Sequence, residues 1–299
     1  MHNRPLAAAG VILCGMAVIG FIDQFVKVIA EQSSLWTFHL VRSGMMWVVV
    51  GSWLILSRRG LRIVNWRGVF GRSAAMSLAM IIYFGALGFL PVAQVAAGLF
   101  TAPIFVLVFS VAFFGLRIGP VRIVAVVLGF TGVVLVLSPD PSSVSPFVFL
   151  PALGGAFYAV AVIATREWCA EEGTLELSMA IFTFMGLWGL GGVLVVGALG
   201  IVGDDFLSRG WVWPTAQVWG LCGMQALGSL FAVLLLTRGY QLAEASLVSV
   251  FEYSVLGFSA LFGWLIWGDL LGPLGFIGMA LIAGAGSLIA LRGDPAVTA

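Results

Sequence analysis

The sequence predicts an all-α polytopic membrane protein whose ten transmembrane helices form two inverted five-helix repeats. Three observations lead to this fold class: the composition, the regular succession of apolar runs, and an internal repeat. Hydrophobic residues make up 61% of the chain and charged residues only 9%, with a mean hydropathy of +1.13. Soluble proteins carry about 25% charged residues, so an ordinary soluble domain is excluded. The formal net charge of +1 argues against a nucleic-acid partner.

Charged residues and clusters of proline and glycine divide the chain into apolar runs, many of them close to the ~20 residues that cross a bilayer core. The first run, Leu6 to Ile22, follows Arg4. It is longer than the apolar part of a signal peptide, so we expect a retained helix. The polar connections are too short for a soluble domain. The expected spans are 6–25, 34–56, 69–89, 92–115, 120–138, 147–166, 176–200, 215–237, 243–267 and 273–291.

An internal repeat relates the two halves of the chain. Leu90–Ala96 (LPVAQVA) aligns with Tyr240–Ser246 (YQLAEAS). Further on, Gly115–Pro120 (GLRIGP) aligns with Gly268–Pro273 (GDLLGP) after an insertion of three residues. Chance similarity between apolar segments is the alternative, but the two matches fall in the same order.

The repeat divides the chain into residues 1–140, with the first five spans, and residues 147–292, with the last five. Less closely, Ala30–Glu31 aligns with Ala170–Glu171. An odd number of spans in each copy places the second copy upside down relative to the first. Inverted repeats of this kind are typical of secondary transporters, whose halves enclose a central site.

Basic residues predict that both termini are cytoplasmic. The outer side receives only Lys27 and Arg209, and Arg42 lies within the second span. The inner side then receives Arg4, Arg58, Arg59, Arg62, Arg67, Arg72, Arg117, Arg122, Arg166, Arg238 and Arg292.

The stretch Ala86–Pro139 and its counterpart Thr237–Pro273 resemble the ten-helix EamA-type transporters of the drug/metabolite transporter superfamily, and the resemblance covers nearly the whole chain. Asp23 with Lys27, the tripeptide 41–43 and the dipeptide 71–72 also resemble a bacterial subgroup. Its relatives include riboflavin, acylcarnitine and S-adenosylmethionine carriers. The resemblance implies a multi-pass protein of the bacterial cytoplasmic membrane, with a substrate cavity between the halves.

The chain departs from this family at one motif. Family members often carry Gly-Glu where the fourth or ninth helix ends. Here the first repeat has Gly115–Leu116 and the second has Gly268–Asp269, so the first acidic residue is absent.

Glu252 is the most informative polar residue, because it lies about ten residues into the ninth span. A carboxylate near the centre of a membrane helix costs roughly 3 kcal/mol or more, so it is paired, protonated or facing water. One hypothesis is a structural partner such as Arg42 or a backbone group. The other is a cavity position with a role in substrate binding or proton coupling.

Arg42 and His39 lie one turn apart on the second span. Either Arg42 snorkels to the outer interface, or it faces the cavity and supplies positive charge for an anionic or zwitterionic substrate. Asp23 and Lys27 are four residues apart near the outer end of the first span. They form either an interfacial ion pair or part of an outer gate.

The family's cavity-lining helices supply further candidates, although each one alone is equally consistent with helix packing. The glycines of the last span predict close helix packing or a homodimer contact. Three cysteines fall in or beside apolar runs, and no metal or cofactor motif accompanies them. The further candidates are Phe251, Tyr253, Gln225, Tyr83, Gln94 and Thr101.

These observations favour a secondary active transporter for a small organic metabolite, working by alternating access and driven by protons, exchange or diffusion. Export of amino acids or drugs is the alternative to metabolite import. A membrane-embedded enzyme is a distant alternative, because the chain has only two histidines and lacks HExxH and GxSxG motifs. A channel or a structural membrane protein is equally distant, since neither requires an inverted repeat.

Overall fold

The computed structural model describes residues 4–86, 90, 92–115, 117–137, 147, 149–201, 203–268, 270 and 272–292. Within this part of the chain, every regular element is a helix. Ten helical segments are long and apolar enough to cross a membrane, as predicted. They are 5–32, 35–57, 66–86, 95–113, 120–137, 149–167, 174–198, 216–242, 245–267 and 273–291.

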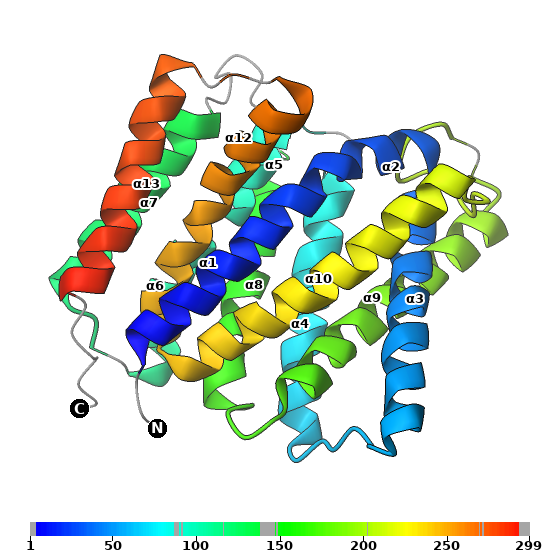
Figure 1. Cartoon of the computed structure of the whole chain (residues 1–299), viewed down its shortest axis with the longest axis horizontal. Helices are drawn as coiled ribbons and strands as arrows, with labels where there is room; N and C mark the ends of the chain where they lie inside the picture. The colour runs from blue at the N-terminus through cyan, green and yellow to red at the C-terminus, as the bar shows by residue number, and fades with distance from the viewer. Residues whose placement is uncertain are drawn as a thin grey trace.

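Thirteen α-helices build these spans, because three of the spans are divided (Figure 1). The helices are α1 (Pro5–Ile22), α2 (Val26–Gln32), α3 (Leu35–Ser57), α4 (Trp66–Ala86), α5 (Val92–Leu99), α6 (Ala102–Phe114), α7 (Pro120–Leu137), α8 (Phe149–Glu167), α9 (Thr174–Ala198), α10 (Ala216–Leu242), α11 (Ala245–Val248), α12 (Ser254–Trp267) and α13 (Pro273–Arg292).

The first and ninth spans change to 3-10 geometry in their interiors, and the fourth is interrupted. Short 3-10 segments, η1 (Asp23–Phe25) and η4 (Ser249–Tyr253), separate α1 from α2 and α11 from α12. In the fourth span α5 ends at Leu99 and α6 begins at Ala102. Pro103 occupies the first turn of α6, where its missing N–H leaves no intrahelical bond unmade. A break at this proline is what the sequence predicts.

Helix pairs from the two halves of the chain pack against one another. The most extensive pairings are α7 with α13, α4 with α8, α1 with α10, and α3 with α9. Glycines allow the closest of these approaches: a Cβ added at Gly132 of α7 would lie 2.6 Å from the Gly278 carbonyl oxygen of α13. Gly278 therefore serves packing within the chain. Large apolar side chains on the outside of the bundle, such as Leu56 and Leu291, are exposed and suit contact with lipid tails.

α1 begins and α13 ends at the same end of the bundle, which we term the terminal end; the other is the distal end (Figure 1). Polar contacts close the terminal end. Glu172, in the α8–α9 connection, accepts hydrogen bonds from the backbone N–H groups of Val64 and Asn65, before α4. The Gln241 amide of α10 donates to the carbonyl oxygens of Cys169 and Glu172.

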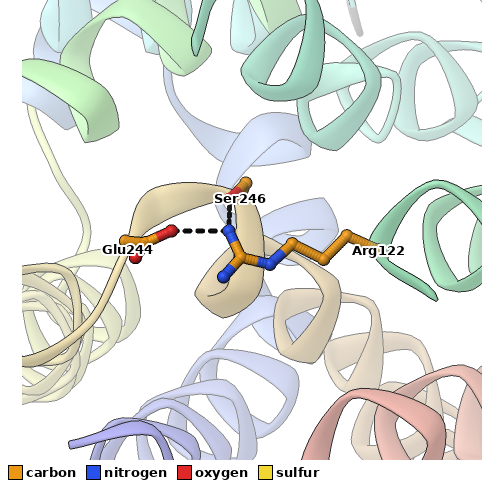
Figure 2. A network of polar contacts seen from close by, with 3 residues as sticks. All are labelled: Arg122, Glu244 and Ser246. Atoms are coloured by element: carbon orange, nitrogen blue, oxygen red, sulfur yellow. Dashed lines mark hydrogen bonds and ion pairs between the residues drawn. The ribbon is translucent and has the colours of Figure 1, made fainter. Parts of the chain in front are cut away.

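A second contact at the terminal end is an ion pair between the halves (Figure 2). Arg122 Nη1, in the first turn of α7, lies 2.5 Å from Glu244 Oε2 and donates to Ser246 Oγ at 2.8 Å. The charge pattern alone places Arg122 and Arg72 among the basic residues of the cytoplasmic side. The structure adds that both side chains are buried within the bundle, each 2% exposed, because hydrogen-bond acceptors inside the protein receive them.

Candidate functional site

A cavity of about 210 Å³ lies at the centre of the bundle. Eight of the ten described spans contribute to its lining, and the pair formed by α7 and α13 does not. Apolar residues dominate the wall, with four methionines among them: Met16, Met76, Met80 and Met185. Polar and charged side chains from several helices interrupt this apolar wall, as in other small-molecule sites.

The lining is more exposed toward the distal end than toward the terminal end. Asp23 is exposed and Tyr83 is half-buried on the distal side. On the terminal side Arg72, Thr237 and Tyr240 line the same cavity and are buried. The cavity is thus closed from the terminal end by packed, hydrogen-bonded side chains.

Glu252 lines the cavity from η4, at the point where the ninth span leaves regular α geometry. Its side chain is 6% exposed, and its Oε1 accepts a hydrogen bond of 2.6 Å from the hydroxyl of Tyr158 on α8. Tyr240 of α10 lines the same cavity, but its buried hydroxyl has no hydrogen-bond partner among the described residues. Tyr158 is therefore the partner of this carboxyl group, and Arg42, the partner considered from the sequence, bonds elsewhere.

Arg42 points into the bundle and does not reach the outer interface, since its side chain is 5% exposed and lines the cavity. Nη2 lies 3.2 Å from Nδ1 of His39, one turn earlier on α3. The guanidinium carbon stands 4.6 Å from the ring centroid of Phe38 and 5.8 Å from that of Phe182. These contacts fix the orientation of the guanidinium group. His39 is buried behind Arg42 and is not part of the lining.

Asp23 and Lys27 have different surroundings, although one helical turn separates them. Asp23 lies in η1 and lines the cavity. Lys27, in α2, is exposed and outside the lining. Among the described residues the two do not form the ion pair considered from the sequence. An outer-gate role for them stays a prediction.

Two more predicted residues line the cavity. Tyr83 contributes its side chain from α4, and Gln225 from α10. The Gln225 amide also donates to the Ile22 carbonyl oxygen at 2.7 Å, where α1 gives way to η1. That contact ties α10 to the first span at the point where its helix geometry changes.

Besides His39, three predicted residues lie outside this lining, and a role for them in binding stays a prediction. The Thr101 hydroxyl donates to the Gly98 carbonyl oxygen at 2.6 Å, within the break of the fourth span. Phe251 lines a separate apolar groove between α1, α12 and α13. Tyr253 is fully buried and packs edge-on against Phe100. The side chain of Gln94 lies outside the described residues.

Sequence reasoning missed Arg72, Tyr158 and Tyr240 as cavity residues. Arg72 donates to Thr165 Oγ1 at 2.8 Å, to the Leu177 carbonyl oxygen at 3.0 Å and to Thr237 Oγ1 at 3.2 Å, and so joins α4 to α8, α9 and α10. The scarcity of tyrosine is a usable signal. The chain has four, and three of them line this cavity.

Residues 6–138 match the model of the EamA-like transporter family. The pseudopaline exporter CntI of Pseudomonas aeruginosa is 29% identical over 228 residues, covering 76% of this chain and 74% of the relative. A riboflavin transporter of Rhizobium johnstonii is 28% identical, covering 80% and 76%. An uncharacterized transporter of Helicobacter pylori is 28% identical and covers 97% of each chain. These relatives are transporters, not enzymes.

One protein of known crystal structure has the same fold as this chain, with a TM-score of 0.77. It is 18% identical and covers 95% of this chain and 97% of the other. That likeness concerns the fold, while the ten apolar spans and the transporter relatives identify a multi-pass membrane protein.

Proposed function

Because this chain belongs to the EamA-like transporter family, we propose that it is a secondary active transporter that moves a small organic metabolite across the bacterial cytoplasmic membrane by alternating access. Its curated relatives are transporters of small molecules, which supports the general class. The central cavity is the observation that carries the proposal for this chain. It is lined by spans of both halves, and its described lining residues are more exposed toward the distal end than toward the terminal end.

We further propose that residues 1–140 and 147–292 are inverted repeats. The helix breaks support this proposal: α5 ends at Leu99 and α11 ends at Val248, a separation of 149 residues. The alignment of Leu90 with Tyr240 requires 150, so the two helices end within one residue of each other in the alignment.

Packing gives independent support to the repeat. In the proposed repeat, each span of the first half corresponds to the span five places later. Under this correspondence the α1–α10 pair (first and eighth spans) becomes the α8–α4 pair (sixth and third spans). The α3–α9 and α7–α13 pairs each consist of two corresponding spans, so the exchange leaves them unchanged. A two-fold pseudo-symmetry accounts for both kinds of pairing, and rocking of two such halves about a central site is the general route to alternating access.

If the termini are cytoplasmic, as the basic residues predict, the distal end faces outward and this structure is the outward-facing state. The Arg122–Glu244 ion pair and the contacts of Glu172 would then close the cytoplasmic side. Transport requires a second state in which those contacts separate and the distal end closes.

Glu252 is our candidate for the coupling group. A carboxyl group in a cavity that alternates between two aqueous sides can take up a proton on one side and release it on the other. Its hydrogen bond from Tyr158 holds it at the wall between α8 and η4. Direct binding of the substrate by Glu252 is the alternative role. The direction of transport depends on how substrate movement is coupled to proton movement. Export, as in the Pseudomonas relative, is therefore the alternative to import.

The test is flux into and out of proteoliposomes holding the purified protein, with and without an imposed proton gradient. The solutes are riboflavin and panels of amino acids and other small metabolites. We expect saturable flux for at least one solute, and expect Glu252→Gln to abolish its dependence on the gradient. Glu171→Gln, at an exposed carboxylate of the α8–α9 connection, is the matched control.

Each outcome bears on a different part of the proposal. Wild-type gradient dependence in Glu252→Gln would remove Glu252 from the coupling step. Absence of saturable flux for the entire panel would count against the transporter assignment itself.

A further inference from the structure

We propose that Asp23 and Arg42 form a charge-recognition site for a zwitterionic substrate, with the carboxylate of the substrate on Arg42 and its cationic group on Asp23. This inference rests on the proposed transport function and specifies its substrate class. The argument comes from the hydrogen bonds that these two residues make and from those that they leave open.

Arg42 is held rigidly, yet it has an open donor. Nη2 is bonded to His39 Nδ1, and the aromatic rings of Phe38 and Phe182 lie beside the guanidinium group. The Nε–H group is buried and has no hydrogen-bond partner among the described residues. A buried donor without a partner is costly, and a carboxylate is the acceptor whose geometry matches the guanidinium fork best. An anionic ligand would therefore satisfy what the protein leaves unsatisfied.

His39 acts here as a positioning residue. Because Arg42 remains protonated, it can only donate, so Nδ1 of His39 must be the acceptor and the imidazole must be neutral. A neutral imidazole can lie beside the guanidinium without repulsion. It thereby fixes the direction of the fork without compensating its charge.

Asp23 provides the opposite charge. Its side chain is exposed within a membrane-spanning segment and lines the cavity. No hydrogen bond or ion pair joins its carboxylate to any residue that the structure describes. A carboxylate in a membrane-spanning segment is normally paired or faces a water-filled cavity, and in such a cavity a cationic group of a ligand can pair with it.

Asp23 and Arg42 line the same cavity, and no ion pair joins them among the described residues. Arg122 and Glu244 of the same chain, in contrast, close to 2.5 Å. Opposite charges that share one cavity and remain apart leave room for a ligand with complementary charges between them. A zwitterion satisfies both groups at once, whereas a simple anion leaves Asp23 unmatched and a simple cation leaves Arg42 unmatched.

The remainder of the wall defines the rest of the substrate. Met76, Met80, Met185 and Phe84 line the cavity together with these charged groups. Methionine side chains adapt to irregular apolar shapes, so this wall suits an apolar body of variable outline. The expected substrate is a small molecule with adjacent opposite charges and an apolar remainder.

The experiment compares molecules that share one apolar body and differ in charge. Thermal shifts of the purified full-length protein are measured with leucine, isoamylamine and 4-methylvalerate, and with phenylalanine, phenethylamine and 3-phenylpropionate. We expect stabilisation by zwitterionic members at concentrations where the amines and the acids have at least tenfold weaker effects. Arg42→Gln should abolish this preference, and Asp23→Asn should shift it toward the acids.

Lys27→Gln is the matched control, because Lys27 lies one turn from Asp23, is exposed and does not line the cavity. His39→Ala should weaken binding of zwitterions and acids but not of amines, a pattern that general destabilisation would not produce. Equal stabilisation by all members of a set, or none by any zwitterion, would overturn the charge-recognition site. Saturable flux of an uncharged solute alongside that result would leave the transport function standing.

Discussion

Glu244→Gln should open the terminal end of the protein. The substitution removes the carboxylate that pairs with Arg122, a side chain 2% exposed, while preserving the size of residue 244 (Figure 2). Removing one partner of a buried ion pair costs about 3 to 5 kcal/mol, because the other charge stays buried. We take the lower limit, since Arg122 keeps Ser246 and the Glu244 side chain is 13% exposed. About 3 kcal/mol corresponds to a roughly 100-fold shift in the equilibrium between closed and open states.

Cys169 provides the assay. It is buried in the α8–α9 connection, and Gln241, close to Glu244, donates to its carbonyl oxygen. Burial raises the pKa of the Cys169 thiol to about 11, which lowers its reactive thiolate fraction about 100-fold relative to an ordinary cysteine. Movement of the α10–α11 turn would hydrate the thiol and lower this pKa. In a Cys14→Ala/Cys222→Ala background, N-ethylmaleimide should therefore label Cys169 at least tenfold faster in the Glu244→Gln variant.

The controls separate opening from misfolding. Glu167→Gln changes an exposed carboxylate in the last turn of α8 and should label at the parental rate. The charge-swapped pair Arg122→Glu/Glu244→Arg should restore slow labelling. If Glu244→Gln labels at the parental rate while eluting as a folded, monodisperse protein, the ion pair does not hold the terminal end closed.

Two further substitutions test the cavity wall and the helix packing. Tyr158→Phe removes the hydrogen bond to Glu252; since such bonds to charged groups contribute about 1.5 to 3 kcal/mol, flux should fall about tenfold or more without loss of folded protein. Gly132→Val places a side chain 2.6 Å from the Gly278 carbonyl oxygen and should lower the melting temperature or prevent folding. Gly284→Ala meets no atom within 4 Å and should leave the melting temperature unchanged; equal effects of the two glycine variants would contradict the packing argument.

The number of spans could be predicted because a bilayer requires every backbone polar group to be satisfied within a long apolar helix. The exact boundaries of the spans could not be predicted. We predicted a third span starting at residue 69, whereas α4 begins at Trp66. That shift of three residues moves Arg72 from the edge of the span toward its interior. Its acceptors, Thr165 and Thr237, come from distant segments, so sequence spacing gave no sign of them.

The direction in which each side chain points was the second feature that could not be predicted from the sequence. Glu252 lines the cavity, whereas its neighbours Phe251 and Tyr253, which were grouped with it from the sequence, do not. In 3-10 geometry consecutive residues point about 120° apart, so one of three neighbours faces any given wall. The break of the fourth span was predictable from Pro103, whereas η4 contains neither proline nor glycine to signal it. Arg42 could be singled out for its charge, yet its contact with Phe182 depends on how α3 meets α9.

The proposed repeat also indicates why the terminal end is the closed one. In the alignment of the halves, Glu244 corresponds to Gln94 and Arg122 corresponds to Gly275. The distal end therefore cannot form the equivalent ion pair when it closes, because neither charge is encoded there. The buried ion pair, which the alignment places at one end and not at the other, thus favours the state closed at the terminal end. A substrate or proton must offset that difference for the protein to turn over. The charged groups facing the cavity, Asp23, Arg42 and Glu252, are where we expect that free energy to be supplied.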